Sequence, residues 1–171
     1  TSNADALSLR LHSAQQAVSS LDLQYYMWVN DTSGRLLASE LLRAADRGVR
    51  VRVLIDDMYA RKLDRVLMTL DAHPNLELRL YNPYRTRASK VGNVFEFVFS
   101  GFRPNHRMHN KAWIVDGQIA IVGGQNIGDE YFGVHEGFNF RDLGVLVSGA
   151  AAHEASAEFD SYWNSPIVIP L

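Results

Sequence analysis

The sequence predicts an α/β fold in which a mixed β-sheet is covered by helices. Apolar residues at helical spacing alternate with short strand-like segments from Asp5 to Tyr81, as is typical of strand–helix–strand units. Two further apolar strands then follow one another around Asp116-Gly117 with no helix between them. A sheet that contains both kinds of connection has parallel and antiparallel neighbours, so we expect a mixed sheet.

The elements of the first half follow in order from their patterns. Apolar residues recur at helical intervals over 5–20, and residues 21–29 form a buried strand. Turn and N-cap residues at 30–34 precede a second helix, which Gly48 ends. The half closes with a strand over 49–56, a helix over about 63–72 that stops before Pro74, and an alternating strand over 76–81.

The second half begins with an irregular stretch, residues 82–105. It is either one wall of a substrate groove or a long surface connection with a packed aromatic patch made of Phe95, Phe97, Phe99 and Phe102. The elements expected after it are strands over 112–115, 119–122 and 142–147 and a helix over 150–163.

Length and composition narrow the class of protein. We expect residues 1–4 to be the remnant of an expression tag and residues 5–171 to form one domain, because 171 residues suffice for one core. The formal net charge is −2, which speaks against a dedicated nucleic-acid binder. Without cysteine there is no disulfide framework and no thiolate zinc site. No apolar run approaches the ~20 residues that span a bilayer.

The most informative segment runs from His109 to Gly117. Residues two apart on a strand point to the same face, so we expect His109 and Lys111 to reach into one pocket. An imidazole can attack phosphorus while an ammonium holds the non-bridging oxygens. This pair predicts phosphoryl or phosphatidyl transfer without a metal.

Further residues support a phosphate site. Asn126 follows Gly123-Gly124 at the end of the next strand, where its amide could donate to the same oxygens and the glycines could bring backbone N–H groups close; the two glycines could equally be a tight turn only. Asp142 is our candidate for the carboxylate that orients the histidine. The alternatives are Asp129, Glu130 and Glu136. Asp116 is expected to have a structural role, capping a turn or pairing with a basic group.

Two groups of residues could be interpreted as metal sites, and both are disfavoured. A zinc site of His106, His109 and His135 with a carboxylate is disfavoured, because the ammonium of Lys111 would repel the metal. Magnesium at Asp56-Asp57 is disfavoured too, since no Gly-rich phosphate loop accompanies them. We expect these aspartates to cap a strand end.

The motif His109-x-Lys111-x4-Asp116, followed by Gly123-Gly124-x-Asn126, resembles the HKD signature of the phospholipase D superfamily. The usual form has Gly-Ser before x-Asn, and Gly124 replaces that serine here. Flanking segments look like the N-terminal half of bacterial cardiolipin synthases, the C-type in particular: residues 21–26, 48–52, 108–111, 126–132 and 162–165.

The resemblance implies an α/β/α sandwich with a mixed, largely parallel sheet flanked by helices. It also implies a phosphohistidine on His109, phosphate oxygens held by Lys111 and Asn126, orientation of the imidazole by Asp142, and no metal or organic cofactor. The implied substrates are phosphatidylglycerol and a second phospholipid such as phosphatidylethanolamine. The implied location is the bacterial inner membrane, bound peripherally on a face that the sequence does not indicate.

The chain carries one HKD set, whereas the resemblance implies two histidines per site. Either a second HKD half follows in the same protein, which the close match to a synthase favours, or two copies pair around a two-fold axis. Two other functions stay open. One is a metal-independent nuclease of the same superfamily, with a basic groove made of Arg85, Arg87, Lys90, Arg103 and Arg107, which could equally hold anionic lipid headgroups. The other is a catalytically incomplete half-domain that binds lipid.

Overall fold

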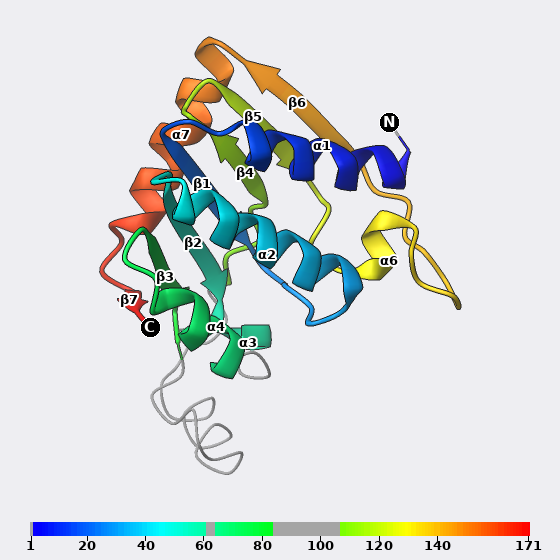
Figure 1. Ribbon diagram of the computed structural model, residues 1–171, viewed down its shortest axis with the longest axis horizontal. Helices are drawn as coiled ribbons and strands as arrows, with labels where there is room; N and C mark the ends of the chain where they lie inside the picture. The colour runs from blue at the N-terminus through cyan, green and yellow to red at the C-terminus, as the bar shows by residue number, and fades with distance from the viewer. Residues whose placement is uncertain (1, 61–63, 84–106) are drawn as a thin grey trace.

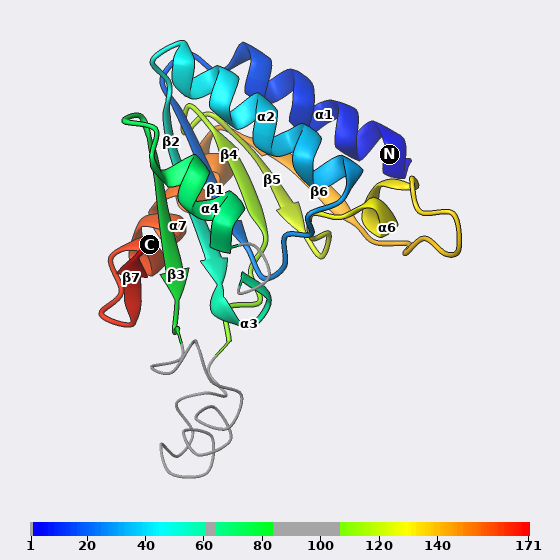
Figure 2. The same cartoon turned by 60° about the horizontal axis from the view of Figure 1, so that its bottom comes forward.

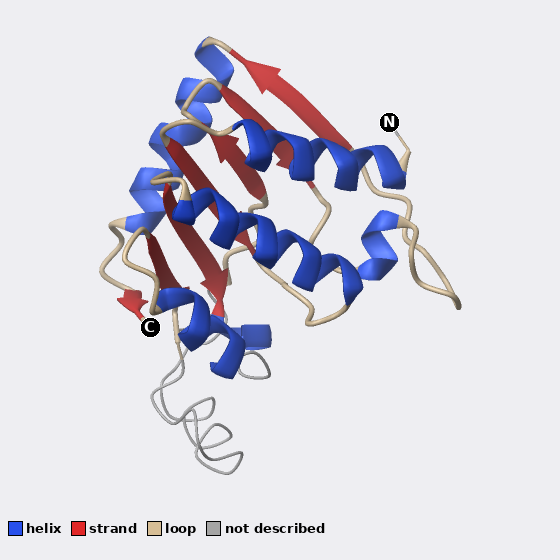
Figure 3. Ribbon diagram, in the orientation of Figure 1, coloured by secondary structure: helices blue, strands red, loops and turns tan. Residues whose placement is uncertain are grey.

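A seven-stranded sheet forms the centre of the molecule in the computed structural model, which describes residues 2–60, 64–83 and 107–171 (Figures 1 and 3). The strand order is β6-β5-β4-β1-β2-β3-β7. The strands are β1 (Ser20–Tyr25), β2 (Arg50–Asp56), β3 (Leu76–Tyr81), β4 (Ala112–Val115), β5 (Ile119–Gly123), β6 (Gly144–Ser148) and β7 (Val168–Pro170).

The sheet is mixed, as the sequence predicts, but it is not largely parallel. Among the described strands, β1–β2 and β2–β3 pair in parallel, and the other four pairings are antiparallel. The parallel part corresponds to the segments joined by helices. A tight turn joins β4 to β5. Two strands joined by a turn run antiparallel, because a parallel neighbour requires a long crossover connection back to the other end of the sheet.

Helices cover both faces of the sheet, which gives the expected three layers (Figure 2). One face carries α1 (Asn3–Gln16), α2 (Thr32–Asp46) and α4 (Asp64–Asp71), and the other carries α7 (Ala150–Trp163). Each face has its own apolar cluster, the larger one beneath α1, α2 and α4. No helix in the described ranges combines the length and the apolar character that crossing a bilayer requires.

An arginine holds α7 against its face of the sheet. Arg52 of β2 forms salt bridges with Asp22 of β1 at 2.6 Å and with Asp160 of α7 at 2.8 Å. Its guanidinium also lies over the rings of Phe159 and Trp163, 4.8 and 5.4 Å from their centroids. The cation is therefore paired and covered by aromatic faces, and these contacts offset the desolvation cost of its partial burial.

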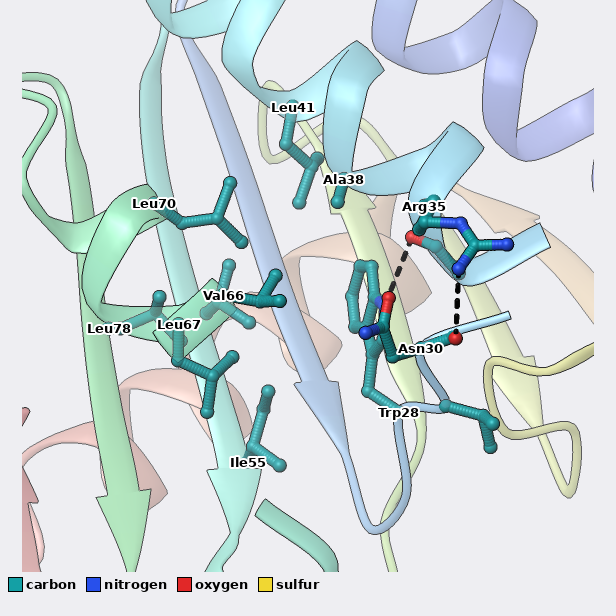
Figure 4. A pocket seen from close by; sticks show the side chains of 13 residues that line it. Trp28, Asn30, Arg35, Ala38, Leu41, Ile55, Val66, Leu67, Leu70 and Leu78 are labelled. Carbon is teal, nitrogen blue, oxygen red and sulfur yellow. Dashed lines mark hydrogen bonds between the residues drawn. The ribbon is translucent and has the colours of Figure 1, made fainter. Parts of the chain in front are cut away.

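Figure 4 shows a narrow apolar cavity between α2, α4 and the sheet, on the face opposite α7. It has a volume of about 20 Å³ and is lined mainly by aliphatic side chains and Trp28, whose indole N–H donates to the Gly34 carbonyl oxygen at 3.2 Å. None of the residues predicted to do chemistry lines it. Most of them gather at one edge of the sheet instead.

Several boundaries differ from the sequence prediction. Strand β1 ends at Tyr25, because the chain then turns away and only Trp28 forms a further bridge, to Ile127. The predicted strand over 142–147 begins at Gly144, so Asp142 lies in the connection before it. The first helix starts at Asn3, where Ser2 and Asp5 form a capping box.

Candidate active site

The strand order brings five distant segments to one edge of the sheet. Because β4 runs antiparallel to β1, and β5 and β6 alternate again, the ends of β1, β2 and β5 lie beside the starts of β4 and β6. The predicted histidine and lysine precede β4, the glycines and Asn126 follow from the end of β5, and Asp142 precedes β6. Pairing of the strands therefore accounts for their convergence.

His109 and Lys111 lie in contact. The Lys111 Nζ is 3.1 Å from His109 Nδ1 and donates to the His109 carbonyl oxygen at 2.6 Å. Lys111 is buried while His109 is exposed. Residues 107–111 are not part of a strand, so the two groups come together by a route other than the shared strand face that the spacing suggested.

Tyr26, just beyond the end of β1, packs on the same pair. Its ring centroid is 4.5 Å from that of His109, with the rings tilted by 35°, and Lys111 Nζ is 5.5 Å from the Tyr26 centroid. The Tyr26 hydroxyl donates to Met58 Sδ at 3.1 Å. Tyr26 is a site residue that the sequence does not reveal, because nothing in the local pattern at the end of a strand indicates a contact with a residue 83 positions later.

The ammonium of Lys111 is in a poorly solvated position. Burial lowers the pKa of Lys111 below its ordinary value of 10.5, and the negative charge of Asp142 partly opposes this effect. The Asp142 carboxylate thus acts on the ammonium through space. A buried cation that lacks a full counter-charge is suited to receive an anionic phosphate.

Asp142 itself does not bind His109. Its Oδ1 accepts a hydrogen bond from the Leu143 N–H at 2.8 Å, and within the described part of the chain it forms none with the imidazole. The carboxylate lies against Gly124, where a Cβ atom would stand only 2.3 Å from Oδ1. The orienting role of Asp142 therefore stays a prediction. Its carboxylate occupies the space that a side chain at position 124 would need, where the usual form of the motif has serine.

The two glycines are required by the approach of the neighbouring chain. Gly123 has φ +156°, and a Cβ there would lie 2.1 Å from the Leu143 carbonyl oxygen. The Gly124 N–H donates to that same oxygen at 3.2 Å. The connection before β6 therefore already uses the Gly124 N–H, which favours the interpretation of the two glycines as a tight turn.

Asn126 is buried at the same edge. Its Oδ1 accepts from the Met27 N–H at 3.1 Å, and its Nδ2 donates to the Tyr131 hydroxyl at 3.1 Å. An amide nitrogen carries two hydrogens, and Tyr131 takes one of them. The second N–H of Asn126 has no partner among the described residues, and the other two bonds fix the orientation in which it could donate to a ligand.

Asp116 has the structural role that was predicted. Its carboxylate accepts hydrogen bonds from the backbone N–H groups of Val18, Ser19 and Ser20, and from the Ser19 hydroxyl. Although partial burial opposes them, these bonds hold its pKa below the ordinary 3.8. Asp116 therefore ties the connection between α1 and β1 to the β4–β5 turn, and it pairs with no basic side chain in the described residues.

The alternative carboxylates lie elsewhere. Asp129 accepts from the backbone N–H groups of Thr32 and Ser33 at the start of α2, while Asp31 accepts from the Asp129 N–H. Asp129 belongs to the short helix α6 (Asp129–Phe132), so it is not a solvated charge in a loop. Glu130 and Glu136 form no side-chain hydrogen bond in the described structure, and neither reaches His109.

Asp56, at the end of β2, supports the segment that carries the histidine. Its carboxylate accepts from the backbone N–H groups of Met58 at 2.9 Å and Met108 at 3.0 Å, and from Arg107 Nη1 at 3.2 Å. This is the expected capping of a strand end. Burial is the largest influence on Asp56 and raises its pKa above 3.8, against the opposing effect of these bonds.

Residues proposed for the metal and basic-groove alternatives are mostly outside this site. His135 Nδ1 accepts from the Gly137 and Phe138 N–H groups in the loop after α6. Within the described ranges no three histidine, aspartate or glutamate side chains gather as metal ligands would. The other proposed residues lie outside the described ranges: His106, Arg85, Arg87, Lys90, Arg103, Phe95, Phe97, Phe99 and Phe102.

Comparison with known proteins identifies relatives over almost the whole chain. Cardiolipin synthase C of Escherichia coli K12 is 46% identical over 168 residues, which cover 98% of this chain and 35% of that protein. The chain spans about a third of the length of the curated relatives it matches.

Solved structures show the same fold at low identity. A phosphatidylserine synthase of Haemophilus influenzae has a TM-score of 0.74 at 19% identity, over 99% of this chain and 37% of that one. NucT of Helicobacter pylori has a TM-score of 0.68 at 16% identity, over 99% of this chain and 92% of that one. The profile of the family described as "Cardiolipin synthase, PLD-like domain" matches residues 10–163, and the chain therefore belongs to this family of phospholipase D-like domains.

Proposed function

We propose that this domain supplies one half of the active site of a phosphatidyltransferase that makes cardiolipin through a phosphohistidine. The observation that carries the proposal is the contact between His109 and the buried ammonium of Lys111, at the sheet edge where Asn126 also lies. This contact supports the proposal, because a nucleophile and a charge stabiliser that already lie together need little reorganisation when a ligand binds.

His109 is the proposed nucleophile. In the structure its Nδ1 faces the Lys111 ammonium, so attack proceeds from the other ring nitrogen, Nε2. The attack forms a P–N bond and breaks the ester bond to the leaving alcohol. For this attack the imidazole must carry its proton on Nδ1. Lys111 must therefore move from Nδ1 toward the phosphate, and a carboxylate must accept the Nδ1 proton in its place. Asp142 is the candidate for this carboxylate.

Lys111 and Asn126 are the proposed phosphate ligands. The ammonium has one N–H beyond its two contacts with His109, and the amide has one beyond Tyr131. Both donors are buried, so bulk water screens them little and their attraction for a developing negative charge is strong. The Tyr26 ring packs against the imidazole and is proposed to restrict its orientation.

A second histidine completes the proposed site. It protonates the leaving alcohol and then removes the proton from the hydroxyl of the acceptor lipid, which attacks phosphorus and breaks the P–N bond. We place this histidine on a second HKD half, either in the same protein or on a second copy. The reaction as proposed needs no metal or organic cofactor.

Phosphatidylglycerol is the proposed donor of the phosphatidyl group. With a second phosphatidylglycerol as acceptor the leaving alcohol is glycerol; where phosphatidylethanolamine is the donor, it is ethanolamine. The similarity to bacterial cardiolipin synthases supports this substrate class. It also supports a peripheral position at the bacterial inner membrane.

The direct test uses the protein encoded by the whole reading frame, with labelled phosphatidylglycerol in the presence of EDTA. We expect His109→Ala to abolish labelled cardiolipin. His153→Ala is the matched control, because His153 is exposed on α7 and far from the motif in sequence. Cardiolipin formation that is equal in the two variants contradicts the proposal.

A metal-independent phosphodiesterase that cleaves DNA as a dimer is the second candidate. The solved chain of NucT has this fold, and the alignment covers 99% of this chain and 92% of that one. This candidate predicts DNA cleavage in EDTA that depends on His109, with no cardiolipin formed. Liposome binding without turnover of either substrate indicates instead a catalytically incomplete half-domain.

A further inference from the structure

A buried arginine lies beneath the loop that carries Asn126. Arg10 of α1 is only 2% exposed. Its guanidinium donates to the Tyr25 hydroxyl at 3.2 Å, to the Ala6 carbonyl oxygen at 2.9 Å and to Gln125 Oε1 at 3.4 Å. Its carbon atom Cζ is 5.4 Å from the centroid of the Phe132 ring. All of these partners are neutral.

This arginine has no counter-charge in the described structure. No carboxylate of residues 2–60, 64–83 or 107–171 forms a salt bridge with it. By contrast, two partly buried arginines are paired: Arg107 binds Asp56, and Arg52 binds Asp22 and Asp160. A buried cation without an anion is costly, so an anionic partner at Arg10 stabilises the fold.

A small pocket adjoins the uncompensated cation. It has a volume of about 40 Å³ and lies between α1 and strands β5 and β6, with Arg10 and Gln125 in its wall beside the apolar side chains of Leu9, Ile121 and Leu146. The volume exceeds the roughly 10–15 Å³ that a water-sized occupant needs. No acidic side chain lines it.

Two polar side chains line this pocket, and each has donor groups to spare. Arg10 uses Nε and Nη1 in the hydrogen bonds above, and Nη2 has no partner among the described residues. Gln125 is also 2% exposed and accepts from Arg10 through Oε1, which leaves its Nε2 without a partner in the same part of the chain. Arg10 and Gln125 therefore each have an N–H group without a partner in the described structure, and both residues line a pocket that has no acidic side chain.

We propose that this pocket binds a monatomic monovalent anion, with chloride as the physiological ligand. The anion receives hydrogen bonds from Arg10 Nη2 and Gln125 Nε2 and neutralises the buried guanidinium. Arg10 is the one cationic residue in the lining, so its single charge matches a monovalent anion. Since Gln125 stands between Gly124 and Asn126, the anion ties α1 to the active-site loop. This inference is independent of the proposed transferase reaction.

The first test is thermal unfolding of the chain in sodium chloride, bromide, sulfate or gluconate at one ionic strength. A ligand that binds only the folded state raises Tm. At about ten times its Kd, the expected rise for a domain of this size is roughly 3–6 °C. We expect chloride and bromide to raise Tm relative to gluconate, whereas sulfate stabilises proteins in general by exclusion from their surface and serves only to show that background. Equal Tm values in chloride, bromide and gluconate overturn the proposal and indicate water in the pocket.

Three variants locate the effect. Gln125→Glu supplies a carboxylate beside Arg10, and Arg10→Met removes the cation; both should lose the chloride-dependent rise in Tm. Arg50→Met is the matched control, because Arg50 is exposed and has no side-chain hydrogen bond in the described structure. It should keep the full response. A halide response that persists in Gln125→Glu and Arg10→Met contradicts the assignment.

A crystal grown in bromide tests the site without any variant. The anomalous signal of bromide is expected between Arg10 and Gln125. Its absence there, at a bromide concentration that raises Tm, overturns the location.

Discussion

At the scale of single residues, the contact between His109 and Lys111 has two consequences. It places a cation where phosphate charge will build up, and it occupies the imidazole Nδ1 before a ligand arrives. A ligand that attracts Lys111 therefore frees Nδ1 as it binds. The charge state of Lys111 should control the affinity of the site for anions.

That control can be measured as a pH dependence. Burial lowers the pKa of Lys111 below 10.5, so the ammonium is lost at a lower pH than in an ordinary lysine. We expect the affinity for tungstate, which keeps its charge across this range, to fall as pH rises from 7 toward 10.5. In Lys111→Arg the guanidinium stays charged, and the affinity should hold over the same range. Identical pH profiles for the two proteins contradict this account of Lys111.

Tyr26 offers a second residue-scale prediction. Aromatic contacts of this kind contribute about 0.5–1.5 kcal/mol beyond burial. If the stack fixes the plane of the nucleophile, Tyr26→Ala should lower kcat about 2- to 10-fold with little change in KM, because the effect falls on orientation and not on lipid binding. Tyr26→Phe keeps the ring and should retain most of kcat. A loss of equal size in Tyr26→Phe assigns the effect to the hydroxyl.

Gly124 and Asp142 should behave as a coupled pair. A Cβ at position 124 would stand 2.3 Å from Asp142 Oδ1, so Gly124→Ser forces the carboxylate away and should cost about 1–3 kcal/mol of unfolding free energy. In the Asp142→Ala background most of this cost should disappear. Urea unfolding of the two single variants and the double variant measures the coupling, and additive effects refute it.

At the scale of elements, Asp116 links two connections that are far apart in sequence. Asp116→Ala removes the acceptor of three backbone N–H groups and one hydroxyl, which should cost on the order of 2–3 kcal/mol of unfolding free energy. The pKa of Asp116 is lowered by these bonds, so its contribution is present above about pH 3.8 and is lost as pH falls through the lower folded value.

The matched control for Asp116 is Asp116→Asn. Position 116 has φ +53°, a conformation that asparagine tolerates, so this variant keeps the backbone and removes the titrating group. Its stability should not show the additional loss that the wild type shows in acid. If chemical denaturation gives parallel stability profiles below pH 4, Asp116 is not the group responsible.

Patterns of the sequence predict long elements and fail for short ones. The spacing of apolar residues located α1, α2, α4 and α7 and six of the seven described strands. Helices α3 (Asp57–Ala60) and α6 have four residues and strand β7 has three, too few to show a period. Their formation depends on tertiary contacts, such as the pairing of β7 with β3.

At the scale of the whole molecule, the site results from strand order. The motif identified His109, Lys111 and Asn126, and the structure brings their segments to one edge. Tyr26, Tyr131 and Arg10 were not identified, because each reaches the site through a contact that no local pattern encodes. The prediction of a largely parallel sheet, made from the resemblance, was wrong. The directions of β4, β5 and β6 depend on the connections between the strands, which no local pattern encodes.

The most direct measurement for the whole account is a rapid acid-free quench of the complete protein during turnover of phosphatidylglycerol, followed by mass spectrometry. We expect an acid-labile phosphatidyl adduct on the peptide that contains His109. The adduct should add to the peptide the mass of the donor lipid less that of its headgroup alcohol. The adduct should be absent in His109→Ala. Continued cardiolipin formation with no adduct on His109 at any time would contradict the account.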